Sequence, residues 1–265
     1  MSGISLNVKG LGVRYGGTGS SFFSRGEGVW ALKSVSFSMC AGETLSVVGE
    51  SGSGKTTLLR SLLGLVRPTV GEIELWGRSL AAMTDDERLA VRRRCGYVPQ
   101  DPYGSLPPTL TVLGAVIEPW SIVRGSRGET RERGIAKAEE LLLELKLPED
   151  LWGARVKYSL SGGQRQRVAV ARALILDPEV LLCDEPTAMQ DVSTRGEVLD
   201  VLIARVRRGM SMILVTHDLL LARQAAKQAL VLYRGEIVES GGTDELFERP
   251  SHEYTRSLLA ALPRI

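Results

Sequence analysis

The chain has little of what a metal centre, a disulfide framework or a membrane span requires. Its three cysteines, Cys40, Cys95 and Cys183, stand far apart with no C-x-x-C spacing, and only two histidines are present. We interpret the cysteines as small buried residues in a reducing compartment. No apolar run approaches the roughly 18 residues of a transmembrane helix, and no apolar signal-peptide segment opens the chain. We therefore expect that the chain does not cross a membrane by itself, so that any membrane role requires a partner.

An excess of either charge is also lacking, because 33 basic and 31 acidic side chains leave a net charge of +2. This balance gives no electrostatic argument for a nucleic acid or an anionic lipid surface as a partner. Arginines clustered within residues 92–94 and 124–133 fit solvated helix faces or loops better than binding patches. The 265 residues, 43% of them hydrophobic, suit one globular domain with or without a sizeable insertion.

One stretch, LSVVGESGSGKTTLLRSLLGL at residues 45–65, organises the rest of the chain. An apolar strand is expected before GESGSGKT, and leucines at helical spacing follow it. GESGSGKT matches G-x-x-x-x-G-K-[ST], whose glycines let backbone N–H groups form an anion cradle at a helix N-terminus. Lys55 would reach the β- and γ-phosphates of a nucleotide and the Thr56 hydroxyl would bind Mg²⁺, whereas the alternative is a loop ending in a solvated lysine. The predicted cradle comprises Gly49, Glu50, Ser51, Gly52, Ser53, Gly54, Lys55, Thr56 and Thr57.

Apolar patterns elsewhere predict an α/β fold. Early strands are expected at residues 4–13 and 29–38, separated by a glycine- and serine-rich loop at 18–28. Buried strands are expected at 180–183 and 212–215, each followed by polar residues and a helix, as in a mostly parallel sheet.

A helical insertion is expected between residues 111 and 147. Its clearest run has apolar residues at helical spacing with glutamates and lysines between them: Ile135, Ala138, Leu141, Leu142 and Leu145. Thr84 and Glu87 have the spacing of a capping box, which predicts the start of a short helix. Residues 230–240 are expected to form a hairpin, and two short helices close the chain.

An acidic pair ends the expected strand LLCDE. Adjacent carboxylates at the carboxyl end of a strand lie in the crevice where α/β sheets bind ligands. Asp184 would hold Mg²⁺ through its water shell, and Glu185 would orient and deprotonate an attacking water. The alternative is a solvated acidic turn.

A second candidate phosphate binder is the turn LSGGQ, which opens a helix. It offers a hydroxyl, backbone N–H groups and the positive end of a helix dipole, from Ser161, Gly162, Gly163 and Gln164. Because one triphosphate seldom needs two such binders, we expect this turn to contact the nucleotide of a partner subunit.

The order of GESGSGKTT, LSGGQ and LLCDEPT resembles the ATP-binding subunits of ABC transporters, over about residues 5–262. The resemblance implies ATP and Mg²⁺ as cofactors, Gln100 as a metal- and γ-phosphate-sensing glutamine, and His217 as the group that contacts the γ-phosphate. A histidine that is merely hydrogen-bonded at a strand end is the alternative for His217. Tyr15 is the candidate to stack on the base and Trp30 is the second candidate, although either could belong to the core.

Within the family, the chain is most similar to the oligopeptide, dipeptide and nickel importer ATPases. The loop before ALKSVSF, the stretch VPQDPYGSL and the tail RPSHEYTRSLL carry this likeness. Some members have a cysteine cluster near the C-terminus that this chain lacks, so we expect no iron–sulfur centre. Where the family usually has Ser-Ala-Leu-Asp, this chain has Ala188, Met189, Gln190 and Asp191. Either the lost hydroxyl weakens signalling to the opposite site or the change is a solvent-exposed one.

The resemblance implies a P-loop NTPase core with a small antiparallel β subdomain and an inserted α-helical subdomain. We expect a single domain at 4–262, with the helical subdomain at about 105–160 and a C-terminal extension at about 240–265. The implied function is ATP hydrolysis that powers an importer for peptides or a related small solute. The implied partners are a second ABC ATPase subunit and integral membrane permease subunits, at the cytoplasmic face of the cell membrane.

Two alternative functions stay open. An ABC ATPase of DNA repair or translation commonly has two ATPase halves or a long coiled-coil insertion, and neither is present. A subunit of a soluble enzyme complex, like the phosphonate-degradation ATPases, is not excluded. If the chain serves a permease, the family implies a docking groove after Gln100, with Tyr103 and Leu106 as apolar anchors. The alternative is that both side chains belong to the core.

Overall fold

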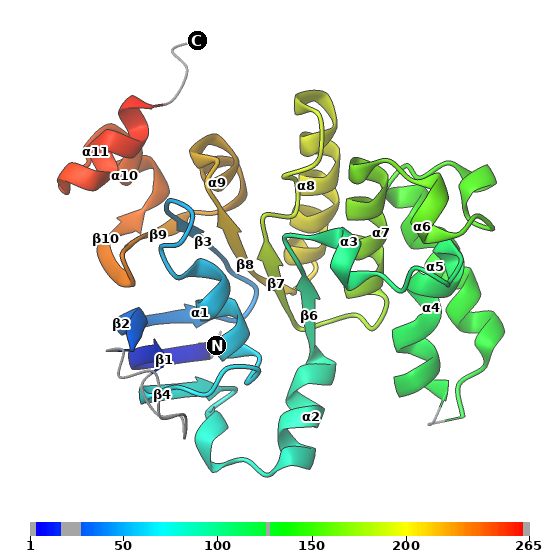
Figure 1. The fold of residues 1–265 in the computed structure, drawn as a ribbon, viewed down its shortest axis with the longest axis horizontal. Coiled ribbons are helices and arrows are strands. Elements are labelled where there is room, and N and C mark those ends of the chain that lie inside the picture. Colours follow the sequence, from blue (N-terminus) through cyan, green and yellow to red (C-terminus); the bar gives the residue numbers. More distant parts are fainter. Residues whose placement is uncertain (1–3, 17–27, 126–127, 262–265) are drawn as a thin grey trace, which may run out of the picture. The chain divides into compact units, whose positions relative to one another are not determined.

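The computed structural model describes residues 4–16, 28–125 and 128–261. They form two compact units, one from the described residues up to 91 together with those from 213 onward, and the other from those between 92 and 212 (Figure 1). The expected loop at 18–28, which carries part of the importer likeness, lies outside the described residues except for Gly28. Within the described ranges, no helix is long and apolar enough to cross a lipid bilayer.

The first unit contains an antiparallel sheet with the strand order β2-β1-β4-β5. Its strands are β1 (Ile4–Tyr15), β2 (Val29–Cys40), β4 (Val70–Leu75) and β5 (Arg78–Ser79). The pairing register of β1 shifts between Val8 and Leu11, where Gly10 has a φ of 58°. This bulge inserts one residue, so that Val8 and Leu11 are both buried although they are three positions apart.

Strands β10, β9, β3 and β8 of the first unit are hydrogen-bonded neighbours in that order. They are β3 (Thr44–Val48), β8 (Ser211–Thr216), β9 (Gln228–Tyr233) and β10 (Glu236–Gly242). β3 and β9 are parallel, and every residue of β8 is buried, as expected for strands covered on both faces. The cradle sequence leaves the carboxyl end of β3 and enters α1 (Lys55–Leu62), whose Leu58, Leu59 and Leu62 are buried.

The C-terminal part of the first unit packs back onto β3 and β9. The predicted hairpin is confirmed, with Arg234 and Gly235 both at positive φ in the tight turn between β9 and β10. Two helices, α10 (Thr243–Glu248) and α11 (Glu253–Ala260), follow it, and α9 (Leu219–Ala225) lies against β3. Side chains of α10 and α11 pack on a cluster that includes Val48 and Val231.

In the second unit, β6 (Cys95–Val98) and β7 (Val180–Asp184) are parallel neighbours. Helix α2 (Asp85–Arg94) leads into β6 and begins at the predicted capping box, in which Thr84 and Glu87 exchange hydrogen bonds. Hydrogen bonds from Arg78 and Thr84 lower the pKa of Glu87 to about 2, so the box stays charged at neutral pH.

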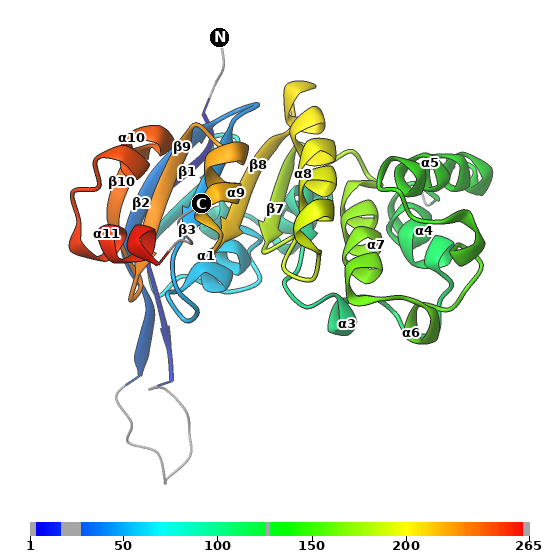
Figure 2. The same cartoon turned by 90° about the horizontal axis from the view of Figure 1, so that it is seen from above.

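Helices make up most of the second unit, and α4, α5 and α7 pack against one another (Figure 2). The helices are α3 (Pro102–Ser105), α4 (Val112–Val123), α5 (Arg131–Glu144), α6 (Val156–Ser159), α7 (Gly162–Leu174) and α8 (Val192–Arg207). Single 3₁₀ turns lie at Leu80–Ala82 in the first unit and Glu149–Leu151 in the second. Of the residues expected on one face of α5, Ala138, Leu141, Leu142 and Leu145 are buried.

Packing between α4 and α5 gives a stability prediction. A Cβ at Gly134 would lie 2.5 Å from Cδ1 of the buried Trp120, so Gly134→Ala should force the ring or the helix to move. We expect Gly134→Ala to lower the free energy of unfolding by about 1–3 kcal/mol, the usual cost of overpacking.

The matched control is Gly196→Ala in α8, where a Cβ meets nothing within 4 Å. This variant should raise the free energy of unfolding by about 0.5–1 kcal/mol, because alanine has the higher helix propensity. Thermal melting of the two variants is the measurement. Equal melting temperatures would contradict the described contact.

Candidate functional site

The turn between β3 and α1 is too tightly folded for side chains at two of its glycines. A Cβ at Gly49 would lie 2.2 Å from the carbonyl oxygen of Leu232, and one at Gly54 would lie 2.4 Å from that of Ala31. Gly54 also has a φ of 110°, in the left-handed region that favours glycine. The two glycines therefore let the backbone approach strands β9 and β2 closely enough to form the cradle.

Lys55 places a buried positive charge in this cradle. Lys55 is 6% exposed, and its Nζ donates hydrogen bonds of 2.7 Å to the carbonyl oxygens of Gly49 and Glu50. Ser53 Oγ is buried beside it, without a hydrogen-bond partner among the described residues. An enclosed ammonium group and an unsatisfied hydroxyl suit an anionic ligand, so the cradle fits the phosphates of a nucleotide.

Thr56 and Thr57 lie half-buried in the first turn of α1, at the positive end of the helix dipole. The Thr56 hydroxyl is a hard oxygen ligand of the kind that Mg²⁺ prefers. Within the described residues, no group of three or more His, Cys, Asp or Glu side chains could hold a metal alone. Mg²⁺ bound through phosphates needs only one or two side chains, so this donor set is compatible with it.

Tyr254 of α11 contacts the cradle, and the sequence reasoning missed it. Its hydroxyl accepts a hydrogen bond of 2.8 Å from the Glu50 N–H, and its ring stacks on Tyr233 with a centroid distance of 4.0 Å. The carbonyl of Gly49 and the N–H of Glu50 belong to one peptide group, so Lys55 and Tyr254 hold the two ends of that group. Burial raises the pKa of Tyr254, and the hydroxyl remains protonated at neutral pH. The sequence motif RPSHEYTRSLL includes Tyr254, but it gave no indication that this residue contacts the cradle.

In the second unit, three candidate residues lie at or just beyond the carboxyl ends of β6 and β7. Because these strands are parallel neighbours, with Val98 opposite Cys183, Gln100 and Glu185 emerge at the same edge. Asp184 is 2% exposed, Glu185 is half-buried and Gln100 is exposed. Glu185 has a φ of 50°, which is uncommon for a residue with a side chain and often marks a functional position.

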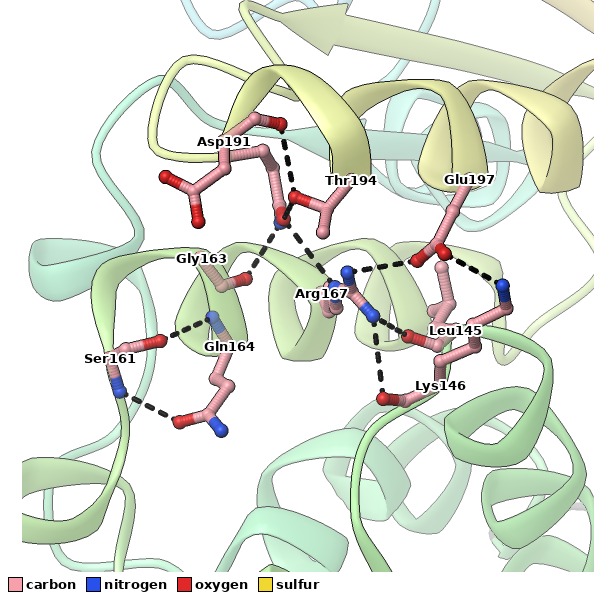
Figure 3. Close-up of polar contacts among 10 residues, drawn as sticks. Leu145, Lys146, Ser161, Gly163, Gln164, Arg167, Asp191, Thr194 and Glu197 are labelled. Carbon is pink, nitrogen blue, oxygen red and sulfur yellow. Dashed lines mark hydrogen bonds and ion pairs between the residues drawn. The ribbon is translucent and has the colours of Figure 1, made fainter.

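The LSGGQ turn begins α7 with a complete capping box. Ser161 Oγ accepts a hydrogen bond of 3.2 Å from the Gln164 N–H, and Gln164 Oε1 accepts one of 2.9 Å from the Ser161 N–H (Figure 3). A Cβ at Gly163 would lie 3.1 Å from the carbonyl oxygen of Met189. The Ser161 hydroxyl proton can still be donated, so the turn retains the donors and the helix dipole that a phosphate requires.

The remaining two candidates lie in the first unit. His217 is exposed and directly follows β8, the neighbour of β3, and Asp218 caps α9 by accepting from the Leu221 N–H at 3.1 Å. Tyr15 ends β1 and is 47% exposed, which leaves its ring available for stacking. Trp30, the second candidate, is 38% exposed and lies beneath the guanidinium of Arg14.

Comparison with protein families gives a match to the ABC transporter family over residues 32–188, more than half of the chain. The chain belongs to this family. The "Putative peptide import ATP-binding protein" of Brucella ovis is 38% identical to this ABC ATPase over 97% of the chain and 78% of its own length. The glutathione import ATP-binding protein GsiA of Salmonella paratyphi A is 38% identical over 97% of the chain, which spans 41% of GsiA.

Solved ABC cassettes have the same fold. The ATP-binding cassette MJ0796, in a dimeric post-hydrolysis state with ADP and Pi, matches with a TM-score of 0.80 and 32% identity. The alignment covers 90% of this chain and 98% of that one. CbiO1 from Clostridium perfringens, part of an ABC transporter complex, matches with a TM-score of 0.75 and 26% identity over 98% and 96% of the two chains. The predictions of an ABC ATPase family and an α/β ABC fold are confirmed.

One expectation for this ABC ATPase is wrong. Leu106 was expected to expose an apolar anchor together with Tyr103, but it is 3% exposed and belongs to the core. The Leu106 N–H bonds to the carbonyl of Pro102, and this one-turn helix, α3, directs the side chain inward. Tyr103 is 55% exposed, and the guanidinium of Arg165 lies over its ring at 4.6 Å. A docking surface can therefore include Tyr103 but not Leu106.

The contact between Tyr254 and the cradle predicts an effect on nucleotide affinity. Tyr254→Phe keeps the stacked ring but removes the acceptor for the Glu50 N–H. We expect the dissociation constant for ATP to rise about 3- to 10-fold, the scale of one hydrogen bond. Calorimetric titration of the full chain measures this change.

Tyr233→Phe is the matched control, because it alters the other ring of the stack and leaves the bond to Glu50 in place. Its ATP affinity should equal that of the wild type. Equal affinities for wild type and Tyr254→Phe would contradict the anchoring role of the hydroxyl.

Proposed function

We propose that this chain is the ATP-hydrolysing subunit that powers an ABC importer for peptides or a related small solute. One observation carries the proposal: a single chain has two distinct helix starts suited to a phosphate group, the cradle before α1 and the capped turn before α7. One triphosphate needs one cradle, so the second serves the nucleotide of a partner ATPase. The relatives named for peptide and glutathione import support import over the alternative, a subunit of a soluble enzyme complex.

ATP with Mg²⁺ supplies the phosphoryl group for transfer to water. Lys55 neutralises charge on the β- and γ-phosphates, and the backbone of residues 49–57 surrounds them. Thr56 in the first unit would be a ligand of Mg²⁺, and Asp184 and Gln100 in the second unit are the other candidates to hold it. The metal would neutralise charge on the phosphates, and the ring of Tyr15 would stack on the base. The metal requires oxygen ligands, the phosphates require a cation and the base requires an aromatic face. The named side chains supply these groups.

Glu185 orients the attacking water and accepts its proton, as its carboxylate at the end of β7 permits. His217 contacts the γ-phosphate and responds to its loss. The capped turn at residues 161–164 closes on the nucleotide of the partner ATPase. ATP binding therefore joins the two subunits and hydrolysis separates them, so the output is mechanical.

The partners follow from this mechanism. A second ABC ATPase completes each nucleotide site, and integral membrane permease subunits receive the motion. The chain works as a peripheral subunit at the cytoplasmic face of the cell membrane. No nucleic acid is involved, in line with the net charge of +2.

Glu185→Gln tests the proposed function. We expect hydrolysis by the assembled complex to slow by about 10² or more, because the general base is lost. The dissociation constant for ATP should stay within about twofold, since the amide retains the size of the carboxylate. The measurements are the steady-state rate of phosphate release and ATP binding by calorimetry.

The matched control is Glu132→Gln, which removes the same charge from the same unit at an exposed position in the first turn of α5. It should hydrolyse ATP at the wild-type rate. A wild-type rate for Glu185→Gln in the complex would refute the role assigned to Glu185.

Tyr103→Ala tests the membrane partner. The exposed ring over Arg165 is an aromatic anchor of the kind that dominates protein interfaces. We expect the affinity for detergent-solubilised permease subunits to fall at least about tenfold, with melting and ATP binding unchanged. Leu143→Ala, at a side chain 53% exposed on α5, is the control and should bind the permease normally. Unchanged co-purification of Tyr103→Ala would remove Tyr103 from the interface.

A further inference from the structure

The carboxylate of Glu239, in β10, receives three hydrogen bonds from the segment that begins α11. Its Oε1 accepts from the Ser251 N–H at 2.7 Å and from Ser251 Oγ at 2.8 Å. Its Oε2 accepts from the His252 N–H at 3.0 Å. Both oxygens of this half-buried side chain therefore hold the residues through which the chain enters the helix. Charge-assisted bonds to two neighbouring residues fix the direction of α11 as well as its position.

Two features of Glu239 keep this contact in place. The pairing register of β10 shifts between Ile237, opposite Leu232, and Glu239, opposite Val231. The residue inserted at such a bulge changes the direction of the side chains around it. Burial opposes ionisation of Glu239, but the hydrogen bonds that its carboxylate accepts outweigh burial and lower its pKa to about 2. The anchor of α11 is therefore charged at neutral pH.

The first turn of α11 carries the position of the anchor to Tyr254. His252 is the N-cap of the helix, and its Nδ1 accepts a hydrogen bond of 3.1 Å from the Tyr254 N–H. The guanidinium of Arg256 donates to the carbonyl of Pro250 at 3.2 Å and to that of Ser251 at 2.6 Å. The start of the helix is thus closed by its own hydrogen bonds, so it moves with the carboxylate that holds it.

Tyr254 in turn holds the first peptide group of the phosphate cradle. Its hydroxyl accepts from the Glu50 N–H at 2.8 Å, while Lys55 Nζ donates to the carbonyl of Gly49 in the same peptide group. A phosphate that draws Lys55 away from this carbonyl would leave the hydroxyl as the remaining partner of the peptide. A series of hydrogen bonds therefore runs from β10 through α11 to the cradle, and all of its members lie in the first unit.

We propose that Glu239 is a positioning residue for the nucleotide site, because it directs α11 so that the Tyr254 hydroxyl orients the cradle for ATP. This inference rests on the proposed function in one respect, that the cradle binds ATP. Docking of α11 and binding of ATP then stabilise each other, since coupling between two binding events is reciprocal. Loss of the anchor weakens ATP binding, and ATP slows the opening of α11.

Apolar contacts keep α11 on the sheet when the anchor is lost. Leu258 and Leu259 pack against the cluster that contains Val48 and Val231. Removal of the hydrogen bonds to Glu239 should therefore change the direction of the helix without unfolding the chain.

Three substitutions separate positioning from general packing. Glu239→Gln keeps the size of the side chain but removes its charge and one acceptor oxygen. Glu239→Asp keeps the carboxylate on a shorter stem. Glu253→Gln, the control, removes the same charge from an exposed position in the first turn of α11. Glu239→Gln is also combined with Tyr254→Phe. The full chain is titrated with ATP by calorimetry, and hydrogen exchange of α11 is followed with and without ATP.

We expect Glu239→Gln to raise the dissociation constant for ATP about 3- to 10-fold, because it acts through the same hydrogen bond as Tyr254→Phe. In the Tyr254→Phe background, Glu239→Gln should then change this constant by less than about twofold. Glu239→Asp should lie between Glu239→Gln and the wild type, and Glu253→Gln should bind ATP as the wild type does. ATP should slow hydrogen exchange in α11 of the wild type, and less so in Glu239→Gln.

Additive losses of affinity in the double variant would overturn the inference in favour of a packing role, whatever the melting temperatures. Equal losses in Glu239→Gln and Glu253→Gln would overturn it as well, as would exchange in α11 of the wild type that ATP does not slow. A wild-type chain that does not bind ATP would overturn the proposed function and this inference together. A wild type that binds ATP, with an unaffected Glu239→Gln variant, overturns this inference alone.

Discussion

The backbone of the phosphate cradle approaches its neighbouring strands so closely that two positions exclude any side chain. Gly49 lies against the Leu232 carbonyl of β9, and Gly54 lies against the Ala31 carbonyl of β2. These strands belong to different sheets, so both sheets of the first unit determine where the cradle lies. Lys55 is buried in the same cradle, and its ammonium group donates hydrogen bonds to two carbonyls of the cradle. Phosphate oxygens offer this lysine a better partner than neutral carbonyls do, and this difference favours nucleotide binding.

The second unit positions its functional groups differently. There, hydrogen bonds hold them in place, whereas in the first unit the cradle depends on glycines that leave no room for a side chain. Asp184 is the last residue of β7 and Glu185 follows it; all five residues of the strand are buried, so the strand holds both acids in place. Burial raises the pKa of the adjacent Cys183 thiol, which remains protonated and adds no charge beside Asp184. Beyond the strand, turns and side-chain bonds set the direction of the loop, and apolar contacts contribute little to the exposed Ala188 and Met189.

Local sequence patterns predicted the elements well, because each depends on neighbours in the chain. The cradle between β3 and α1, the Thr84 capping box and the hairpin at Arg234 all have local signals, and the structure contains them. Contacts between distant segments had no such signal: Tyr254 and Glu50 are 204 positions apart. The burial of Leu106 was missed for a related reason, since a proline-rich segment without periodicity does not indicate which side chain faces inward. The roles of all the candidate site residues, Tyr15, Gln100 and His217 among them, remain predictions.

The position of Gln190 illustrates why a polar residue can serve where the family usually has leucine. A buried leucine packs without directional preference, so a loop held by it can slide relative to the turn beside it. An amide whose oxygen faces Arg167 and whose nitrogen faces Gly163 has one favourable orientation, and sliding breaks two hydrogen bonds at once. A link of this kind transmits a small displacement of the turn instead of absorbing it. The hydrogen bond to Gly163 therefore fixes the loop after β7 in one position on the turn that begins α7.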